Sequence, residues 1–228
     1  MSQPSEKPVK QNKSLLKNPF FWGAIIGMAI LPVLRMLAMA RRDAPAPLVE
    51  VETWQLRDSQ NRLVSQESLN GKIVIFNLYY DDCSVECQNS FEMLGEVKKR
   101  FDSQLDNVEI LSLPVLDIAS DDGANGFSLD SIQKRFSWTF LGGSNLELKQ
   151  ILLEKMKLQS VLKDMGTLLA KEGTELQQTL ILKRMADSGK LYLLDQNGDL
   201  RLAVDTQMSS LAGLVRAGLF LLEKGPDA

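Results

Sequence analysis

Two long apolar runs stand out in the middle of the chain. Residues 73–80 read Ile-Val-Ile-Phe-Asn-Leu-Tyr-Tyr, and residues 108–113 read Val-Glu-Ile-Leu-Ser-Leu before Pro114. Runs of this length with few polar positions are typical of strands that are buried on both faces of a sheet. Between them, residues 84–101 carry apolar side chains three and four positions apart. This spacing predicts an amphipathic helix, so the pattern gives a strand, a helix and a strand in that order.

The flanking patterns complete an α/β domain. A hairpin is predicted around residues 58–61, and a second hairpin around Asn197-Gly198, which is a strong turn signal. A closing amphipathic helix is predicted over residues 208–222. The order of hairpin, strand, helix, strand, short helix, insertion, hairpin and helix matches a thioredoxin-like α/β sandwich, which we place at residues 49–228.

A leucine-rich segment interrupts this order. Residues 145–184 have apolar side chains at helical spacing and are predicted to form a helical insertion. Within it, residues 146–169 are expected to be one helix. A break at Gly173 precedes a second helical stretch that ends at Arg184.

Basic residues border an apolar stretch near the N-terminus. Residues 1–18 are polar and contain four lysines, residues 19–42 are mainly apolar but include Arg35 and end at Arg41-Arg42, and residues 43–48 contain two prolines. A membrane-spanning helix needs about 20 apolar residues, and an arginine near its end can extend its charge to the lipid headgroups. Residues 19–42 are therefore predicted to be a single transmembrane anchor, and residues 43–48 a stiff linker.

The lysines also predict the orientation of the anchor. By the positive-inside rule, the tail of residues 1–18 is cytoplasmic. The domain then lies in the periplasm, on a bacterial inner-membrane protein, or in the equivalent topology of the mitochondrial inner membrane. A cleaved signal peptide is the alternative, because Ala38-Met39-Ala40 has the small-x-small pattern of a cleavage site. Arg41-Arg42 directly after it weighs against cleavage. In both cases the domain faces an oxidising compartment.

Composition narrows the possible chemistry. A formal net charge of -3 and a pI near 5.2 argue against a nucleic-acid partner, which would need a basic face. The chain has two cysteines, Cys83 and Cys87, and no histidine. Two cysteines are too few for a disulfide scaffold but suffice for one dithiol. Any metal or general-base chemistry must therefore proceed without imidazole.

The motif Cys83-x-x-x-Cys87 places two sulfurs one helical turn apart. A rise of about 1.5 Å per residue gives a Cα–Cα distance of about 6 Å, within the range for a disulfide. The same spacing puts both side chains on one helix face, where two thiolates favour a soft ion such as Cu(I). A helix N-terminus lowers the pKa of a thiol, whereas Asp81, Asp82 and Glu86 oppose thiolate formation. Two inert, buried cysteines are the alternative.

Together with its flanking segments, this motif resembles the Sco/SenC family of membrane-anchored, thioredoxin-fold copper chaperones for cytochrome c oxidase. The resemblance covers most of residues 49–224. It rests on the anchor, on the cysteine spacing, on residues 69–76 (Leu-Asn-Gly-Lys-Ile-Val-Ile-Phe) and on residues 192–198 (Tyr-Leu-Leu-Asp-Gln-Asn-Gly). It implies copper as the cofactor, Cys83 and Cys87 as ligands, and an oxidase subunit or another respiratory membrane complex as the partner.

The chain departs from this family at the third copper ligand. Family members are thought to use a histidine just before the late strand, and that position falls here on Asp187. Met185 is a substitute soft ligand two positions away, with helix packing as its alternative role. The prolines of the family's cysteine motif and its Asp-Pro motif after the second strand are also absent. The fold and the dithiol carry over, whereas the complete copper site does not.

Other thioredoxin-fold families match less well. A peroxiredoxin would have Thr or Ser three residues before its reactive cysteine, where this chain has Tyr80. A thioredoxin-type reductase would have C-x-x-C and a cis-proline just before the strand that starts near Leu191, where this chain has Ser188-Gly189-Lys190. The peroxiredoxin family is therefore set aside, and a broad-substrate reductase is disfavoured.

Three functions remain open. The first is a copper-handling assembly factor with a two-thiolate site, which is a metallochaperone rather than an enzyme. The second is a thiol–disulfide oxidoreductase that keeps the cysteines of an oxidase subunit or of another chaperone reduced. The third is a non-catalytic, Sco-like docking subunit of a membrane complex, in which the helical insertion provides the contact.

Overall fold

The computed structural model divides the chain into two compact units, Met1–Asp43 and Ala44–Ala228. In the second unit the structure describes residues 46–80, 83–104, 106–115, 132, 134–161, 174–206 and 208–226. In the first unit it describes four residues of the predicted anchor, all of them helical: Ile26, Met28, Ile30 and Leu31. The predicted tail, residues 1–18, lies outside the described residues. Within the described part of the chain, no helix has the length and apolar character needed to cross a membrane.

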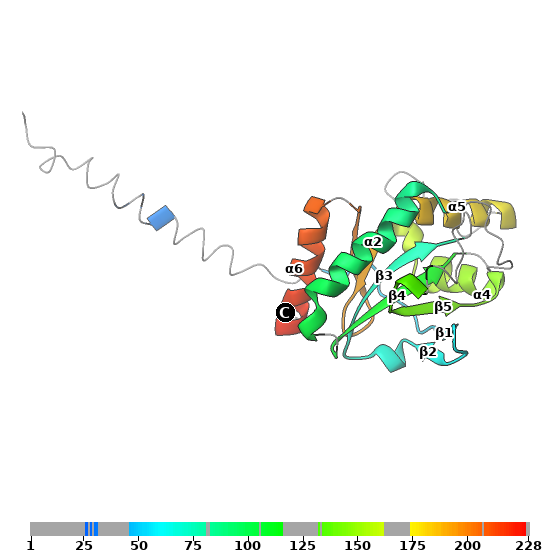
Figure 1. The fold of residues 1–228 in the computed structure, drawn as a ribbon, viewed down its shortest axis with the longest axis horizontal. Helices are drawn as coiled ribbons and strands as arrows, with labels where there is room; N and C mark the ends of the chain where they lie inside the picture. Colours follow the sequence, from blue (N-terminus) through cyan, green and yellow to red (C-terminus); the bar gives the residue numbers. More distant parts are fainter. Residues whose placement is uncertain are drawn as a thin grey trace, which may run out of the picture. The chain divides into compact units, whose positions relative to one another are not determined.

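A seven-stranded sheet forms the centre of the second unit, with the strand order β2-β1-β5-β4-β3-β6-β7 (Figure 1). The strands are β1 (Gln55–Asp58), β2 (Leu63–Ser65), β3 (Ile73–Tyr79), β4 (Val108–Pro114), β5 (Thr139–Gly142), β6 (Leu191–Leu194) and β7 (Leu200–Val204). β3 pairs in parallel with β4 and antiparallel with β6. All of its residues are buried, as its mainly apolar run predicted. The two predicted hairpins are confirmed as the antiparallel pairs β1–β2 and β6–β7.

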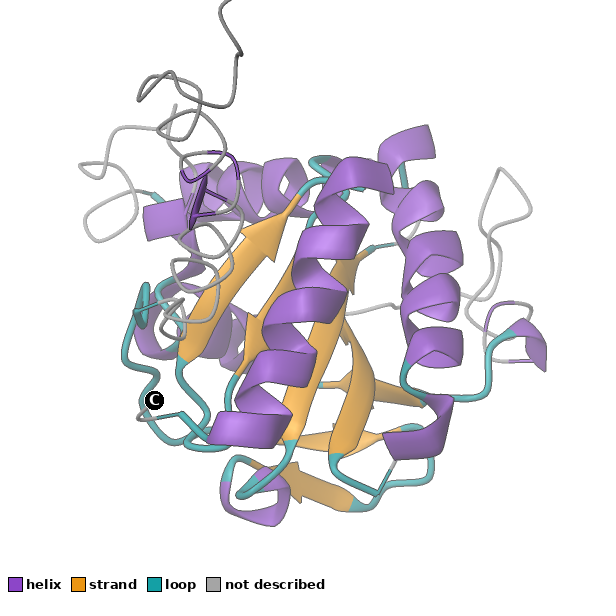
Figure 2. Cartoon of the chain, turned by 90° about the vertical axis from the view of Figure 1, so that its left-hand side faces the viewer, coloured by secondary structure: helices purple, strands orange, loops and turns teal. Residues whose placement is uncertain are grey.

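Helices lie on both faces of this sheet (Figure 1 and Figure 2). They are α2 (Val85–Arg100), α4 (Asn145–Lys149), the π-helix η4 (Gln150–Lys155), α5 (Glu175–Asp187) and α6 (Met208–Lys224). Short 3₁₀ turns complete the described elements: η2 (Glu67–Leu69), η3 (Asp102–Gln104) and η5 (Leu158–Val161). The predicted α/β sandwich is therefore confirmed for the globular unit.

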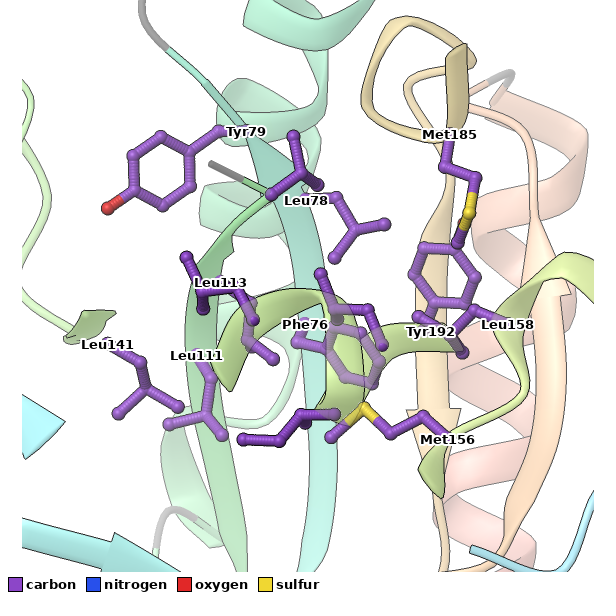
Figure 3. Packing of buried hydrophobic residues seen from close by; sticks show 14 of the residues in the cluster. Phe76, Leu78, Tyr79, Leu111, Leu113, Leu141, Met156, Leu158, Met185 and Tyr192 are labelled. Carbon is purple, nitrogen blue, oxygen red and sulfur yellow. The ribbon is translucent and has the colours of Figure 1, made fainter. Parts of the chain in front are cut away.

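Alternate side chains of β3 enter two hydrophobic cores. Ile73 and Ile75 pack with residues of α2 and α6 in one of them, the α6-side core. Phe76 and Leu78 belong to the other, the dithiol-side core, together with residues of α4, η4 and α5. In this second core the ring of Phe76 stacks on Tyr192 with 5.0 Å between ring centroids (Figure 3). The dithiol-side core also includes both cysteines, which anchors them to the sheet.

The single helix predicted for residues 146–169 is wrong over its described part. α4 starts with a capping box between Ser144 and Glu147, and it continues directly as the π-helix η4. Residues 151–153 are all buried, and the wider turn of a π-helix brings three successive side chains closer to one face. Lys157 then ends the helix with a φ of 50°. Tertiary packing has thus overridden the regular helical period, and residues 162–173 lie outside the described residues.

A buried ion pair organises the β6–β7 hairpin. Arg201 Nε donates to Asp195 Oδ2 at 2.5 Å, and the two side chains are 7% and 0% exposed. Asp195 Oδ1 accepts the backbone N–H groups of Asn197 and Asp199, each at 2.9 Å. Arg201 Nη2 also donates to the carbonyl of Pro226 at 2.7 Å. One carboxylate therefore shapes the turn, while its arginine ties the C-terminal residues to the sheet.

Replacing this arginine tests the role of the pair. Arg201→Met is expected to lower the free energy of unfolding by about 3–5 kcal/mol, because it leaves the Asp195 carboxylate buried without its cation. Urea denaturation of the full chain measures the change. Lys99→Met is the matched control, because Lys99 pairs with Glu96 on the surface, where ion pairs contribute little. Equal losses in the two variants would contradict the assignment.

Candidate functional site

The two cysteines lie where β3 passes into α2. They form a disulfide with a Cα–Cα distance of 5.6 Å, within the usual range for such a bond. The predicted placement of both cysteines on one helix face is wrong, because α2 begins at Val85 after its cap Ser84 and Cys83 therefore precedes the helix. Gln88 Nε2 donates to the carbonyl of Cys83 at 3.0 Å, so a side chain of the helix holds the residue that precedes its cap. The strand-to-helix junction thus presents both sulfurs at the carboxyl end of the central strand.

Both cysteines are buried, but the residues between them are not. Cys83 is 3% exposed and Cys87 is 0% exposed, whereas Val85 is 67% exposed and Glu86 is also exposed. Cys87 Sγ lies 3.7 Å from the carbonyl oxygen of Leu78, to which a reduced thiol can donate. A protein that approaches the dithiol therefore meets an apolar and an acidic side chain first.

Ser84 caps the start of α2. Its Oγ accepts the backbone N–H of Cys87 at 3.2 Å, the arrangement for which serine is favoured at this position. Cys87 consequently lies in the first helical turn, where free N–H groups stabilise a thiolate. Glu86 in the same turn opposes this effect. Asp81 and Asp82, which were expected to oppose it as well, lie outside the described residues.

A chain of hydrogen bonds runs through the interior from Trp138, just before β5, to the second cysteine. Trp138 Nε1 donates to Ser112 Oγ at 2.9 Å, and Ser112 Oγ donates to Asn77 Oδ1 at 2.6 Å. Asn77 Nδ2 donates to Ser90 Oγ at 2.7 Å, and Ser90 Oγ donates to the carbonyl of Cys87 at 2.6 Å. The sequence pattern did not predict a role for these residues. The signal for them was the asparagine and the serine that interrupt the two apolar strands.

The turn between α5 and β6 lies directly against the cysteine motif. A Cβ placed on Gly189 would lie 2.5 Å from the carbonyl oxygen of Glu86, and the φ of Gly189 is 61°. Both the contact and the backbone conformation require glycine. The position at which a thioredoxin-type reductase was expected to carry its proline is thus used here for a backbone contact with the residue between the cysteines.

The two other predicted site residues have different surroundings. Asp187, at the end of α5, is half-buried and accepts the hydroxyl of Tyr80 at 2.8 Å. The ammonium group of Lys183 lies 5.2 Å from the centroid of the Tyr80 ring. Met185 is fully buried, and its side chain points inward among the residues of the dithiol-side core (Figure 3). Asp187 therefore reaches solvent and a hydroxyl donor, whereas Met185 packs in the interior.

As metal ligands, the described part of the site provides the sulfurs of Cys83 and Cys87 and few other suitable side chains. Among the residues that the structure describes, no group of three or more His, Cys, Asp or Glu side chains is placed to hold a metal. Reduced Cys83 and Cys87 suit Cu(I) as a pair of soft thiolates. A carboxylate such as that of Asp187 is a hard ligand, which suits Cu(I) poorly. The metal roles of Met185 and Asp187 stay predictions.

Substitution of the turn glycine tests its contact with the cysteine motif. Gly189→Ala is expected to lower the free energy of unfolding by about 1–3 kcal/mol from the backbone conformation alone, before the displacement of Glu86 is added. Gly213→Ala is the control, because nothing lies within 4 Å of the added methyl group and α6 gains helix propensity. The control is expected to be about 0.5–1 kcal/mol more stable than the wild type. Urea denaturation measures both changes, and an unaltered Gly189→Ala protein would contradict the contact.

Comparison with solved structures identifies the fold. No protein-family model and no curated protein matches the chain. A SCO1/SenC family lipoprotein from Bacillus anthracis str. Ames matches at a TM-score of 0.52 and 18% identity, over 77% of this chain and 96% of that protein. BsSco, described as a member of the Sco family of cytochrome c oxidase assembly proteins, matches at 0.50 and 18%, over 75% and 95%. Yeast Sco1 with copper bound matches at 0.50 and 15%, over 76% and 92%. The globular unit of this chain therefore has the thioredoxin-like fold of Sco/SenC family structures.

Proposed function

We propose that this chain is a membrane-anchored, Sco-like assembly factor that acts on a respiratory oxidase through thiol–disulfide exchange at Cys83 and Cys87. The observation that carries the proposal is the disulfide itself, which joins the two cysteines at the carboxyl end of β3 in a Sco-like fold. Exchange needs two sulfurs, and the site supplies two. The anchor at residues 19–42 and the periplasmic placement of the domain belong to the same proposal and rest on the sequence pattern.

The exchange proceeds in two steps. In the first, one thiolate of the reduced chain attacks a partner disulfide, which forms a mixed disulfide and releases a partner thiolate. In the second step, the remaining thiolate of the chain attacks the mixed disulfide at the sulfur of the chain's other cysteine. This attack closes Cys83–Cys87 and releases the second partner thiolate. Two electrons pass from the chain to the partner, whose cysteines are then reduced and free to bind copper.

Exposed residues between the cysteines fit a protein partner. Val85 and Glu86 stand at the surface while both sulfurs are buried, so the exchange depends on how a partner engages these two side chains. An oxidase subunit with a pair of cysteines is the partner that fits this chemistry. BsSco, with the same fold, is described as belonging to a family of cytochrome c oxidase assembly proteins, which supports that choice.

Copper handling is a second function of the same dithiol. It is favoured by the two adjacent sulfurs at the start of α2 and by yeast Sco1, a structure of the same fold that is described with copper bound. Copper would then be cargo, held by the two thiolates of the reduced chain. The disulfide form has no thiolate to offer, so the ion would be released when exchange with a partner disulfide, which takes up the two electrons, closes Cys83–Cys87.

The exchange function is tested on the full-length protein in detergent, equilibrated with glutathione redox buffers. We expect the disulfide to be reduced and reformed at a potential above about −300 mV, whereas inert structural disulfides have potentials below that value. Free thiols are counted by alkylation and mass spectrometry. Lys99→Met is the matched control and is expected to behave as the wild type does, because it changes a surface residue in the last turn of α2 and keeps both sulfurs. A pair that stays oxidised at every buffer ratio would refute the exchange function.

The copper function is tested by titration of the reduced protein with Cu(I) in competition with a chromogenic chelator. One Cu(I) per chain is expected for the wild type and none for Cys83→Ser. Met185→Leu and Asp187→Asn are expected to bind as the wild type does, because the two thiolates hold the ion. Weaker binding in either of these two variants would instead assign a third ligand. Absence of Cu(I) binding by the wild type would refute the copper function and leave exchange.

A further inference from the structure

The buried hydrogen-bond chain is unusual because it lies in the hydrophobic interior of the sheet. Asn77, Ser90 and Ser112 are each 0% exposed. Burying such groups costs free energy unless their hydrogen bonds are made, and well-packed apolar side chains would avoid that cost. A satisfied polar network instead fixes one arrangement of the groups that it joins.

The network ends on the second cysteine. Ser90 Oγ, held by Asn77, donates to the carbonyl of Cys87 at 2.6 Å. Ser84 accepts the N–H of the same residue, and the Cys87 sulfur lies against the carbonyl of Leu78, the neighbour of Asn77 in β3. Cys87 is thus positioned through its N–H, its carbonyl and its sulfur. Two of these three contacts depend on β3.

The network also crosses the sheet. Trp138 precedes β5, Ser112 lies in β4, Asn77 in β3 and Ser90 in α2. The first turn of α2 is therefore tied to β3, to β4 and to the residue that precedes β5, rather than to one strand. Ordinary hydrophobic contacts, which are not directional, would let this turn rotate or slide by a fraction of an ångström. Directional hydrogen bonds oppose both movements.

We propose that Asn77 and Ser90 are positioning residues for the dithiol, and that they favour the disulfide over the two thiols by holding Cys87 beside Cys83. The inference rests on the proposed exchange function. A disulfide closes more readily when its two sulfurs are held in the bonding geometry, because less conformational freedom is lost on closure. Loosening the first turn of α2 therefore shifts the equilibrium towards the reduced pair, although no sulfur has been changed.

The test is the redox equilibrium of the full-length protein with glutathione. In this reaction the protein disulfide and two glutathione thiols give the protein dithiol and one glutathione disulfide, with two electrons and two protons transferred to the protein. Ser90→Ala is expected to lower the ratio of oxidised to reduced protein about tenfold at a fixed buffer composition, a shift of about 30 mV. Asn77→Leu, which removes the amide at similar volume, is expected to act in the same direction. Ser90→Ala keeps the test open if Asn77→Leu fails to fold.

Leu214→Ala is the matched control. Leu214 is fully buried in the α6-side core, so this variant loses stability without touching the hydrogen-bond chain. The same loss applies to the oxidised and the reduced forms, and the redox equilibrium is expected to stay at the wild-type value. An unshifted equilibrium in Ser90→Ala, or an equal shift in Leu214→Ala, overturns the positioning role while the exchange function stands. A wild-type protein that does not exchange with glutathione overturns both.

Discussion

The pairing of β3 between β4 and β6 is the constraint on which the site depends. β3 is hydrogen-bonded on both edges and buried on both faces, so its carboxyl end has one position in the fold. The chain leaves that end at Tyr79 and reaches Cys83 within a few residues. Open α/β sheets commonly place their reactive groups just beyond the carboxyl ends of their strands. The dithiol therefore derives its location from the register of the central strands rather than from the helix that carries Cys87.

Local patterns predicted β3, α2, β4 and the β6–β7 hairpin because the apolar spacing or turn residues of each element lie within its own segment of the sequence. The insertion was predicted less well, because three successive buried residues at 151–153 favour a π-helix only where a core surrounds them. The close contact of Gly189 with Glu86 joins positions about a hundred residues apart. Nothing near Gly189 in the sequence distinguishes this contact from an ordinary helix-terminating glycine.

The site shows the same division. Cys83 and Cys87 could be selected from the sequence because they are the two cysteines of the chain and stand four residues apart, just after a predicted buried strand. Asn77 and Ser112 were visible only as polar interruptions of apolar strands. Their partners could not be named, because the parallel register that sets Asn77 opposite Ser112 is a property of the assembled sheet. Ser90 lies four residues before Leu94 and seven before Val97, so its spacing placed it on the apolar face of α2 but could not name its partners.

The absence of histidine affects the two possible activities of the dithiol unequally. Holding Cu(I) against competing thiols benefits from a third ligand, and the position expected for it carries a carboxylate, whose oxygen already accepts the Tyr80 hydroxyl. A hard ligand contributes little to the binding of a soft ion. Thiol–disulfide exchange needs no third group, and here it has a helix N-terminus, a serine cap and a buried network that fixes Cys87. The absence of imidazole therefore disfavours metal retention while it leaves the chemistry of sulfur exchange intact, which supports the proposal of exchange rather than copper binding as the primary activity.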